Sequence, residues 1–365
     1  MELQEAKQAV LEATKKLVAS QLVARTWGNI SCRVGEEHFL ITPSGKSYEH
    51  LTEDQLVLVS LEGLAYTGSL KPSSEKGIHA LVYRTHPQVN CVIHTHQEMA
   101  SLMSLVGNDL SISDEWRELL GEIIPTSRYG LPGTKALMNQ VGRILKGYAS
   151  PAVLMANHGA LCFGSSPQEA FSIAEALEGV CKEQVFRLSP LLSSLNGEVQ
   201  IRAFARRDGE EVTYTTNDSP SLQAMGNQIM KSKKDCNYIL LLTSQEVLEV
   251  SERGKTLHAF LDDFAQIAGP SVEIVQEKPT GFHGLKHRDA LIVQKVGAFC
   301  MGSSESEAHA VATLVQKNSK AALLRLSCAQ VKPLPYLDTH LMRYVYKEKY
   351  AKLACSSTKS TGSTS

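Results

Sequence analysis

Two histidines stand one residue apart in an apolar stretch of the chain, His94 and His96 in "VNCVIHTHQ". In a β-strand, side chains at positions i and i+2 point to the same face, so the two imidazoles would project side by side. Two neutral imidazoles on one face suit a divalent transition metal. The alternative is a buried, hydrogen-bonded histidine beside a solvated one, and a lone His-x-His favours it. A metal site therefore needs a third ligand and a reacting group nearby.

His158, in "ANHGA", is the candidate for the third ligand. It follows a predicted buried strand, and Gly159 after it leaves space beside the ring. Three imidazoles and one open coordination position are typical of a catalytic zinc rather than a structural one. We therefore expect one Zn²⁺, or another divalent transition metal, per chain.

Three short blocks of small polar residues, "TWGNIS", "TPSG" and "KPSSE", offer hydrogen-bond donors that could bind a phosphate group. Taken singly, each block is better explained as a plain turn or helix cap. Taken together, they predict a phosphate cradle that needs no P-loop lysine. The predicted phosphate-binding residues are Thr26, Gly28, Asn29, Ser44, Gly45, Ser73 and Ser74.

Glu75 directly follows the third block. A carboxylate in the first turn of a helix is favourable through the helix dipole alone. Here it stands beside the predicted cradle and ahead of the histidine pair, which favours a general acid or base. His79, four residues later, would share a helix face with Glu75, and we assign it a structural role.

The elements that must position these residues alternate between strands and helices, which makes the chain an α/β protein. "TWGNISCRV", "HFLI", "QLVLVS" and "CVIHT" predict strands, and "SEKGIHALVYRT" predicts a helix. The opening residues predict an amphipathic helix. "PAVLMANHGALCFG" predicts a buried strand pair with a bend at Gly159, followed by a long helix. The polar stretch 189–220 is loop-like, and we expect the connection between two domains within it.

A repeat appears when the second half is laid over the first. "AVLMANHGALCFGSSPQEAFSIA" begins at Ala152, and "ALIVQKVGAFCMGSSESEAHAVA" begins at Ala290, an offset of 138 residues (290 − 152). Under this offset His158 falls on Val296, so the second half loses that ligand. Its own histidines at 283 and 287 lie in a glycine-rich stretch and are expected to be solvated. We predict a degenerate second domain without metal ligands.

Composition excludes several classes of protein. The chain has 365 residues, of which 43% are hydrophobic and 21% charged, and its formal net charge is −1. This balance gives no electrostatic case for a nucleic-acid or membrane-surface partner. No apolar run approaches the roughly 20 residues of a membrane-spanning helix. Eight scattered cysteines predict reduced thiols in a cytoplasmic protein.

Six motifs, in order, resemble those of the class II aldolase/adducin family, which includes L-fuculose-1-phosphate aldolase. They are "TWGNIS", "LITPSGKSYEHL", "KPSSEKGIH", "CVIHTHQEMASLMS", "IPTSRYGLPGTKAL" and "LMANHGALCFG". The resemblance implies a three-layer α/β/α fold with a central, largely antiparallel sheet, and subunits packed about a four-fold axis. It implies that His94, His96 and His158 hold the metal and that Glu75 is the catalytic acid/base. It also places Tyr129 near the active site, and it assigns the seven predicted cradle residues to the phosphate loops and pocket.

The resemblance implies a zinc-dependent aldolase that cleaves a ketose phosphate to dihydroxyacetone phosphate and a small aldehyde through a metal-stabilised enediolate. Related 4-epimerases tend to carry aspartate where this chain has Glu75, whereas a dehydratase branch also carries glutamate. An adducin-like scaffold without catalysis is a further alternative, but a scaffold has no reason to keep the three histidines and Glu75. We expect a catalytic domain at 1–195, a degenerate domain at 196–353 and a disordered tail at 354–365. The expected assembly is a homo-oligomer in which two chains, each with two tandem domains, form a ring of four similar units.

Overall fold

A computed structural model describes residues 1–20, 28–46, 48–195, 197–215, 219–254, 256–277 and 288–350. Thr26, the histidines at 283 and 287, and the predicted tail lie outside the described residues. Chain contacts divide the protein into a first unit, Met1–Val185, and a second unit, Phe186–Glu348. Each unit has its own sheet and core, and each is described by itself below.

The first unit contains every predicted element of the first half. Its helices are α1 (Leu3–Ala19), α2 (Lys76–Thr85), α3 (Glu98–Ser104), α4 (Asp114–Leu120), α5 (Lys135–Gly147) and α6 (Pro167–Leu188). Its strands are β1 (Gly28–Val34), β2 (His38–Ile41), β3 (Val57–Ser60), β4 (Cys91–Thr95), β5 (Leu110–Ser111), β6 (Ile123–Ile124), β7 (Thr126–Ser127), β8 (Ala152–Met155) and β9 (Gly159–Gly164).

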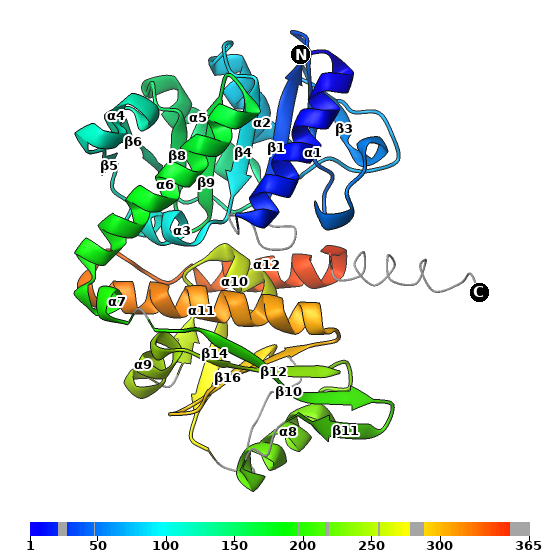
Figure 1. The fold of residues 1–365 in the computed structure, drawn as a ribbon, viewed down its shortest axis with the longest axis vertical. Helices are drawn as coiled ribbons and strands as arrows, with labels where there is room; N and C mark the ends of the chain where they lie inside the picture. The colour runs from blue at the N-terminus through cyan, green and yellow to red at the C-terminus, as the bar shows by residue number, and fades with distance from the viewer. Residues whose placement is uncertain are drawn as a thin grey trace. The chain divides into compact units, whose positions relative to one another are not determined.

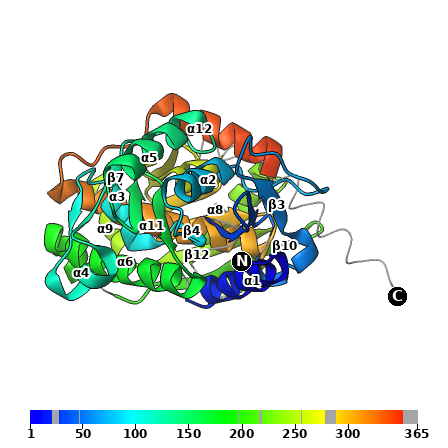
Figure 2. The same ribbon diagram turned by 90° about the horizontal axis from the view of Figure 1, so that it is seen from above.

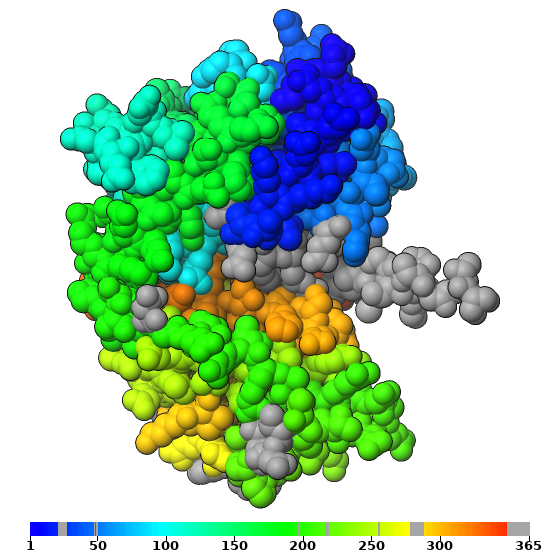
Figure 3. Space-filling view, viewed as in Figure 1, coloured from blue at the N-terminus to red at the C-terminus, as the bar shows by residue number. Residues whose placement is uncertain are grey.

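The main sheet of the first unit has seven strands in the order β3-β2-β1-β4-β9-β8-β7. Its neighbours pair antiparallel except β7 and β8, which are parallel. Figure 1 shows α1 and α6 in front of this sheet, and Figure 2 shows α2 and α5 on its opposite side. The layers are therefore helix, sheet and helix, as the family resemblance implies. In the space-filling view, α1 and α6 form the outer surface of this unit (Figure 3).

Apolar periodicity explains how these layers hold together. The buried residues of α1 recur every three or four positions, as in Ala6, Val10 and Leu17, which is the spacing of one helix face. All five residues of β4 are buried, as expected for a central strand covered on both sides. An apolar cluster joins the sheet to α2 and α5. It includes Phe39, Val153 and Phe163 from the strands, and Val82 and Val141 from the two helices.

The second unit is also a mixed α/β structure. Its helices are α7 (Pro190–Ser194), α8 (Pro220–Ser232), α9 (Gln245–Arg253), α10 (Asp262–Ile267), α11 (Glu305–Ser327) and α12 (Tyr336–Val345). Its strands are β10 (Gln200–Asp208), β11 (Glu211–Tyr214), β12 (Tyr238–Thr243), β13 (Thr256–His258), β14 (Ser271–Val275), β15 (Ala290–Val293) and β16 (Gly297–Gly302). The strand order is β11-β10-β12-β16-β15-β14-β13, and β14 and β15 are parallel.

The prediction of a loop over 189–220 is wrong. This stretch contains α7 and the antiparallel hairpin of β10 and β11, and β10 also pairs with β12 inside the sheet. Arginines and an acidic residue mask the strand pattern of β10 because they occupy four of its nine positions. Phe204 and Ala205 are buried, and the register of β10 shifts between Ala203 and Ala205. This bulge interrupts the alternation that would otherwise have identified the strand.

Seven cysteines lie in the described residues, and all seven are buried free thiols. Burial raises the pKa of Cys162, Cys181 and Cys300, so these thiols stay protonated and pack as small apolar groups. Among the helices of the described ranges, none is both long enough and apolar enough to cross a membrane.

Candidate active site

The three predicted metal ligands come from the central strands of the first unit. His94 lies in β4, between β1 and β9, and His96 follows one residue after the strand ends. His158 lies in the turn that joins β8 to β9, where its backbone N–H donates to the Met155 carbonyl at 3.0 Å. A Cβ at Gly159 would collide with the backbone carbonyl oxygen of Thr95. Glycine is therefore required for this turn to approach the end of β4.

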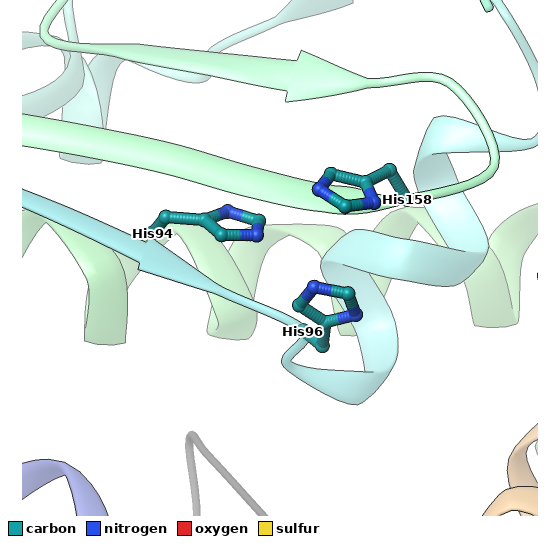
Figure 4. A group of neighbouring side chains, drawn as sticks. All are labelled: His94, His96 and His158. Carbon is teal, nitrogen blue, oxygen red and sulfur yellow. The ribbon is translucent and has the colours of Figure 1, made fainter. Parts of the chain in front are cut away.

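The three imidazoles converge on one point, as Figure 4 shows. Their ring centroids are 4.8 Å apart for His94 and His96, 4.7 Å for His94 and His158, and 4.6 Å for His96 and His158. Each ring offers one nitrogen, and these three nitrogens all lie within 4.8 Å of one another. His94 and His158 are almost fully buried, and His96 is partly exposed. This donor set fits a divalent transition metal that keeps one side open.

Hydrogen bonding fixes the tautomer of His94. Its Nδ1 lies 2.8 Å from the carbonyl oxygen of Ala160, and a carbonyl can only accept, so Nδ1 carries the hydrogen. Burial lowers the pKa of His94 well below its ordinary value, although the nearby Glu75 carboxylate acts in the opposite direction. The ring is therefore neutral, and Nε2 carries a lone pair. That nitrogen is 3.3 Å from Glu75 Oε2. A lone pair facing a carboxylate needs a cation nearby, which supports a metal site.

Glu75 lies at the start of α2, at the N-cap rather than in the first turn. Its backbone N–H donates to Ser73 Oγ at 3.2 Å, which fixes the loop immediately before the helix. Its side chain is only 10% exposed, and Oε1 lies 2.9 Å from Nε2 of His158. The Asn29 amide donates to its other oxygen, Oε2, at 2.8 Å. The carboxylate therefore touches two of the three histidines and a residue of the first polar block.

The three polar blocks meet in the fold. Ser44 N–H donates to the Lys71 carbonyl at 2.9 Å, and Ser73 N–H donates to the Thr42 carbonyl at 3.2 Å. These bonds join "TPSG" to "KPSSE", while the bond from Asn29 to Glu75 joins "GNIS" to the same place.

Two glycines shape these loops. The backbone φ is +73° at Gly45 and +124° at Gly28, a region that side chains disfavour. Glycine therefore suits both loops, and the hydrogen bonds above join each of them to the segment of Ser73 and Glu75.

A buried polar chain behind Glu75 was not recognised from the sequence. Asn29 Oδ1 lies 2.5 Å from His79 Nε2, His79 Nδ1 lies 2.7 Å from Ser31 Oγ, and Ser31 Oγ lies 2.7 Å from the Tyr83 hydroxyl. The only sequence signal was the four-residue spacing between Glu75 and His79, and it favoured a structural role for His79. Ser31 ends the block "TWGNIS" and Tyr83 lies outside the quoted motifs, and nothing local shows that the two side chains join His79 in one chain.

The side chain of Asn29, predicted to bind phosphate, is thus engaged by Glu75 and His79. Tyr129 follows β7, which pairs with β8, the strand that leads to His158. Its side chain is half-buried. The arrangement as a whole combines three histidines that could hold a metal ion, an ionisable carboxylate and donor-rich loops. Such a site can polarise an oxygen, transfer a proton and hold an anionic substrate.

Comparisons with known proteins show which family the first unit resembles. A family model described as the class II aldolase and adducin N-terminal domain matches residues 8–185. The chain is 32% identical over 181 residues to a 5-deoxy-D-ribulose 1-phosphate aldolase from Bacillus thuringiensis serovar kurstaki. That match covers 49% of this chain and 83% of that protein. It is also 26% identical over 226 residues to an L-ribulose-5-phosphate 4-epimerase from Salmonella paratyphi C, covering 58% of this chain and 99% of that protein.

Among solved structures, an L-fuculose 1-phosphate aldolase matches with a TM-score of 0.47 and 30% sequence identity. The match covers 53% of this chain and 88% of the other.

Proposed function

Because the chain belongs to the class II aldolase and adducin family, we propose that it is a metal-dependent aldolase acting on a ketose phosphate. The products would be dihydroxyacetone phosphate, or a similar fragment, and a small aldehyde. The observation that carries the proposal is the contact of Glu75 with His94 and His158 beside the three polar loops. The substrate class is taken from the names of the similar aldolases and epimerase.

His94, His96 and His158 would hold Zn²⁺ or a similar divalent ion, one per chain. Such an ion supplies Lewis-acid chemistry, polarising the carbonyl and hydroxyl oxygens of the substrate. Glu75 would handle the proton. When the bond between C3 and C4 breaks, its electron pair would stay on C3, and the hydroxyl at C4 would become an aldehyde by giving its proton to the Glu75 carboxylate. Glu75 would then protonate C3 to complete the three-carbon product.

The loops would bind the phosphate group through Gly28, Ser44, Gly45, Ser73 and Ser74. Their backbone N–H groups and hydroxyls are donors, and the N-terminus of α2 adds a favourable dipole. Thr26 and Asn29 are proposed to border the same pocket, and Tyr129 is proposed to lie near the reacting carbons. Phosphate binding of this kind fixes the register of the substrate over Glu75.

The second candidate is a sugar-phosphate 4-epimerase, which the similarity to L-ribulose-5-phosphate 4-epimerase favours. The glutamate at position 75 favours the aldolase, because related epimerases tend to carry aspartate there. A dehydratase or an adducin-like scaffold are the remaining alternatives, and a scaffold would need neither metal nor Glu75.

The test is a substrate screen on protein of known metal content. L-Fuculose 1-phosphate and 5-deoxyribulose 1-phosphate are assayed with coupled detection of dihydroxyacetone phosphate, and L-ribulose 5-phosphate is assayed for epimerisation. We expect about one divalent metal per chain and cleavage of at least one ketose 1-phosphate, abolished by a chelator and restored by Zn²⁺. Epimerisation without cleavage would select the second candidate. Metal-free protein without either activity would select the scaffold.

We further propose that the catalytic domain comprises residues 1–195 and that 196–353 form a degenerate domain without metal ligands. Two chains would then assemble a ring of four similar units with two metal sites, in the cytoplasm, where buried cysteines stay reduced. Native mass spectrometry with metal quantitation tests this arrangement. More than one metal per chain, or an active monomer, would contradict it.

A further inference from the structure

In the polar chain behind Glu75, only one assignment of donors and acceptors is consistent. Asn29 donates through Nδ2 to the Glu75 carboxylate, so its Oδ1 faces His79 and can only accept. His79 Nε2 must therefore carry a hydrogen. A reversed amide would instead set the Asn29 oxygen against the carboxylate, which repels it. The orientation of this amide thus depends on a donor at His79.

The donors and acceptors in the rest of the polar chain follow from the neutrality of His79. The imidazole is fully buried, and burial lowers the pKa of His79 to about 4, against the opposing effect of Glu75. With a hydrogen on Nε2, its Nδ1 accepts from the Ser31 hydroxyl, which in turn accepts from Tyr83. Burial raises the pKa of the Tyr83 phenol, which keeps it a donor. Every hydrogen bond therefore points toward Glu75.

The second unit shows that the fold does not need this polar chain of side chains. Arg33 donates to the Tyr83 carbonyl, and Arg207 donates to the Met230 carbonyl in the same way, so Tyr83 and Met230 occupy equivalent positions. The helix register then matches His79 with Gly226 and Glu75 with Leu222.

The strand register gives the match of Ser31 in the second unit. Ser31 pairs with Val92, two residues before His94 in β4, and Ala205 pairs with Ile239 at the matching position of β12. Ser31 is thus replaced by Ala205. Where the carboxylate is absent, the positions of Tyr83, His79 and Ser31 are apolar or glycine, although the strand order is kept. The position of Asn29, which pairs with His94, is taken by Arg202, which pairs with Leu241. The polar chain therefore occurs together with Glu75, and the sheet forms without this polar chain.

We infer that His79 is a positioning residue that acts through Asn29 to hold the Glu75 carboxylate in its reactive orientation. The inference rests on the proposed function of Glu75. His79 itself lies behind Asn29 and donates to its amide oxygen, and Asn29 in turn donates to Glu75 Oε2. The remaining oxygen, Oε1, faces His158. Losing the donor at Nε2 frees the amide to turn and lets the carboxylate rotate away.

Two variants of nearly equal size separate this role from simple packing. In His79→Gln the amide nitrogen reaches about as far as the imidazole Nε2 and can still donate to Asn29. In His79→Asn the amide reaches only the position of Nδ1, so it meets Ser31 and leaves Asn29 without its donor. We expect His79→Asn to lower kcat by about 10–100-fold with KM nearly unchanged, and His79→Gln to restore most of this loss.

Two controls accompany these variants. Val82→Ala, in the apolar core on the same helix, is destabilised by a buried truncation but should keep its kcat. In a Glu75→Gln background, His79→Asn should lower kcat no further, because its effect passes through the carboxylate. Equal losses in His79→Gln and His79→Asn, or a loss that persists in the Glu75→Gln background, would overturn the inference.

A measurement without substrate separates this inference from the proposed function. Long-range ¹H–¹⁵N correlation of histidine-labelled protein, assigned with His79→Gln, reports the tautomer directly. We expect His79 to be neutral at pH 7 with its hydrogen on Nε2. A hydrogen on Nδ1 would overturn the polar chain even in an active enzyme. The expected tautomer in a protein inactive on all sugar phosphates tested would instead overturn the proposed function, and with it the catalytic role of His79.

Discussion

The turn between β8 and β9 and the turn between β15 and β16 have similar backbones but different chemistry. Asn157 and Lys295 both adopt a φ of 63°, and each is followed, two residues later, by a glycine pressed against a backbone carbonyl. In the first turn the residue between them is His158. In the second it is Val296, which packs against the apolar core of the second unit.

The likeness continues into the helices that follow. The Ser165 hydroxyl and N–H donate to Glu169, and Ser303 donates to Glu307 in the same way. On the neighbouring strand, however, the pairing register replaces His94 by Leu241. Shape and chemistry are therefore separable in this fold. Glycines and caps maintain the backbone, whereas a few exchangeable side chains make up the candidate metal site.

The largest effect should come from removing a proposed ligand in the first turn. We expect His158→Ala or His94→Ala to lose the metal and to lower kcat/KM by about 10³-fold, since two imidazoles bind a catalytic metal poorly. Val296→Ala is the matched control in the second turn and should keep both the metal and the activity. Metal analysis and kinetics check these outcomes. Full metal occupancy after either histidine substitution would remove that residue from the ligand set.

Glu75→Gln should separate proton transfer from metal binding. The amide keeps the size of the side chain but cannot accept a proton, so we expect kcat to fall by about 10²–10⁴-fold with the metal retained. Leu222→Ala, at the equivalent position of the second unit, should lower stability alone. If Glu75→Gln turned over at nearly the wild-type rate, the acid/base role would belong to another group.

The two turn glycines, Gly159 and Gly297, should be equally necessary for packing, but only Gly159 should affect metal binding. A Cβ at Gly159 meets the Thr95 carbonyl oxygen, and one at Gly297 meets the Leu242 carbonyl oxygen. We expect each alanine variant to lower the free energy of unfolding of its own unit by about 2–3 kcal/mol.

Only Gly159→Ala should also weaken metal binding, by about 10-fold or more, because it displaces His158. Hydrogen exchange in β9 and β16 and metal titration would measure the two effects. A metal affinity reduced to the same degree by Gly297→Ala would show that the two turns are coupled.

The last prediction concerns the contribution of His79 to the pH dependence of the stability of the first unit. Burial depresses the pKa of His79 from 6.5 to about 4. Between these values the unfolded chain binds a proton that the folded unit does not. The free energy of unfolding should therefore be fully retained above about pH 6.5 and fall by about 3 kcal/mol as the pH drops to 4.

Both tryptophans of the sequence, at 27 and 116, belong to the first unit, so tryptophan fluorescence follows its unfolding. His79→Gln cannot titrate and should show a correspondingly shallower pH dependence. The same slope in wild type and variant would assign the effect to other groups. The second unit has Gly226 at the matched position and supplies no such titration.

Much of the first unit could be predicted from sequence because its signals are local. Apolar spacing indicated α1, α2 and α6, and the buried run of β4 was identified with its histidine. The repeat likewise indicated β15, β16 and α11, through their likeness to β8, β9 and α6. The hairpin of β10 and β11 was missed, because its charged residues and its bulge hide an alternation that only burial against α8 reveals.

The sequence by itself determined the chemical inventory: three histidines, a glutamate and donor-rich turns in the order of a known family. The tertiary structure alone decided which of these residues meet. Strand pairing sets Ala160 beside Thr95 and so brings the turn that carries His158 to the end of β4. The polar chain of Tyr83, Ser31 and His79 forms only when α2 packs on β1. Such contacts depend on register and packing between distant segments, and no local pattern encodes them.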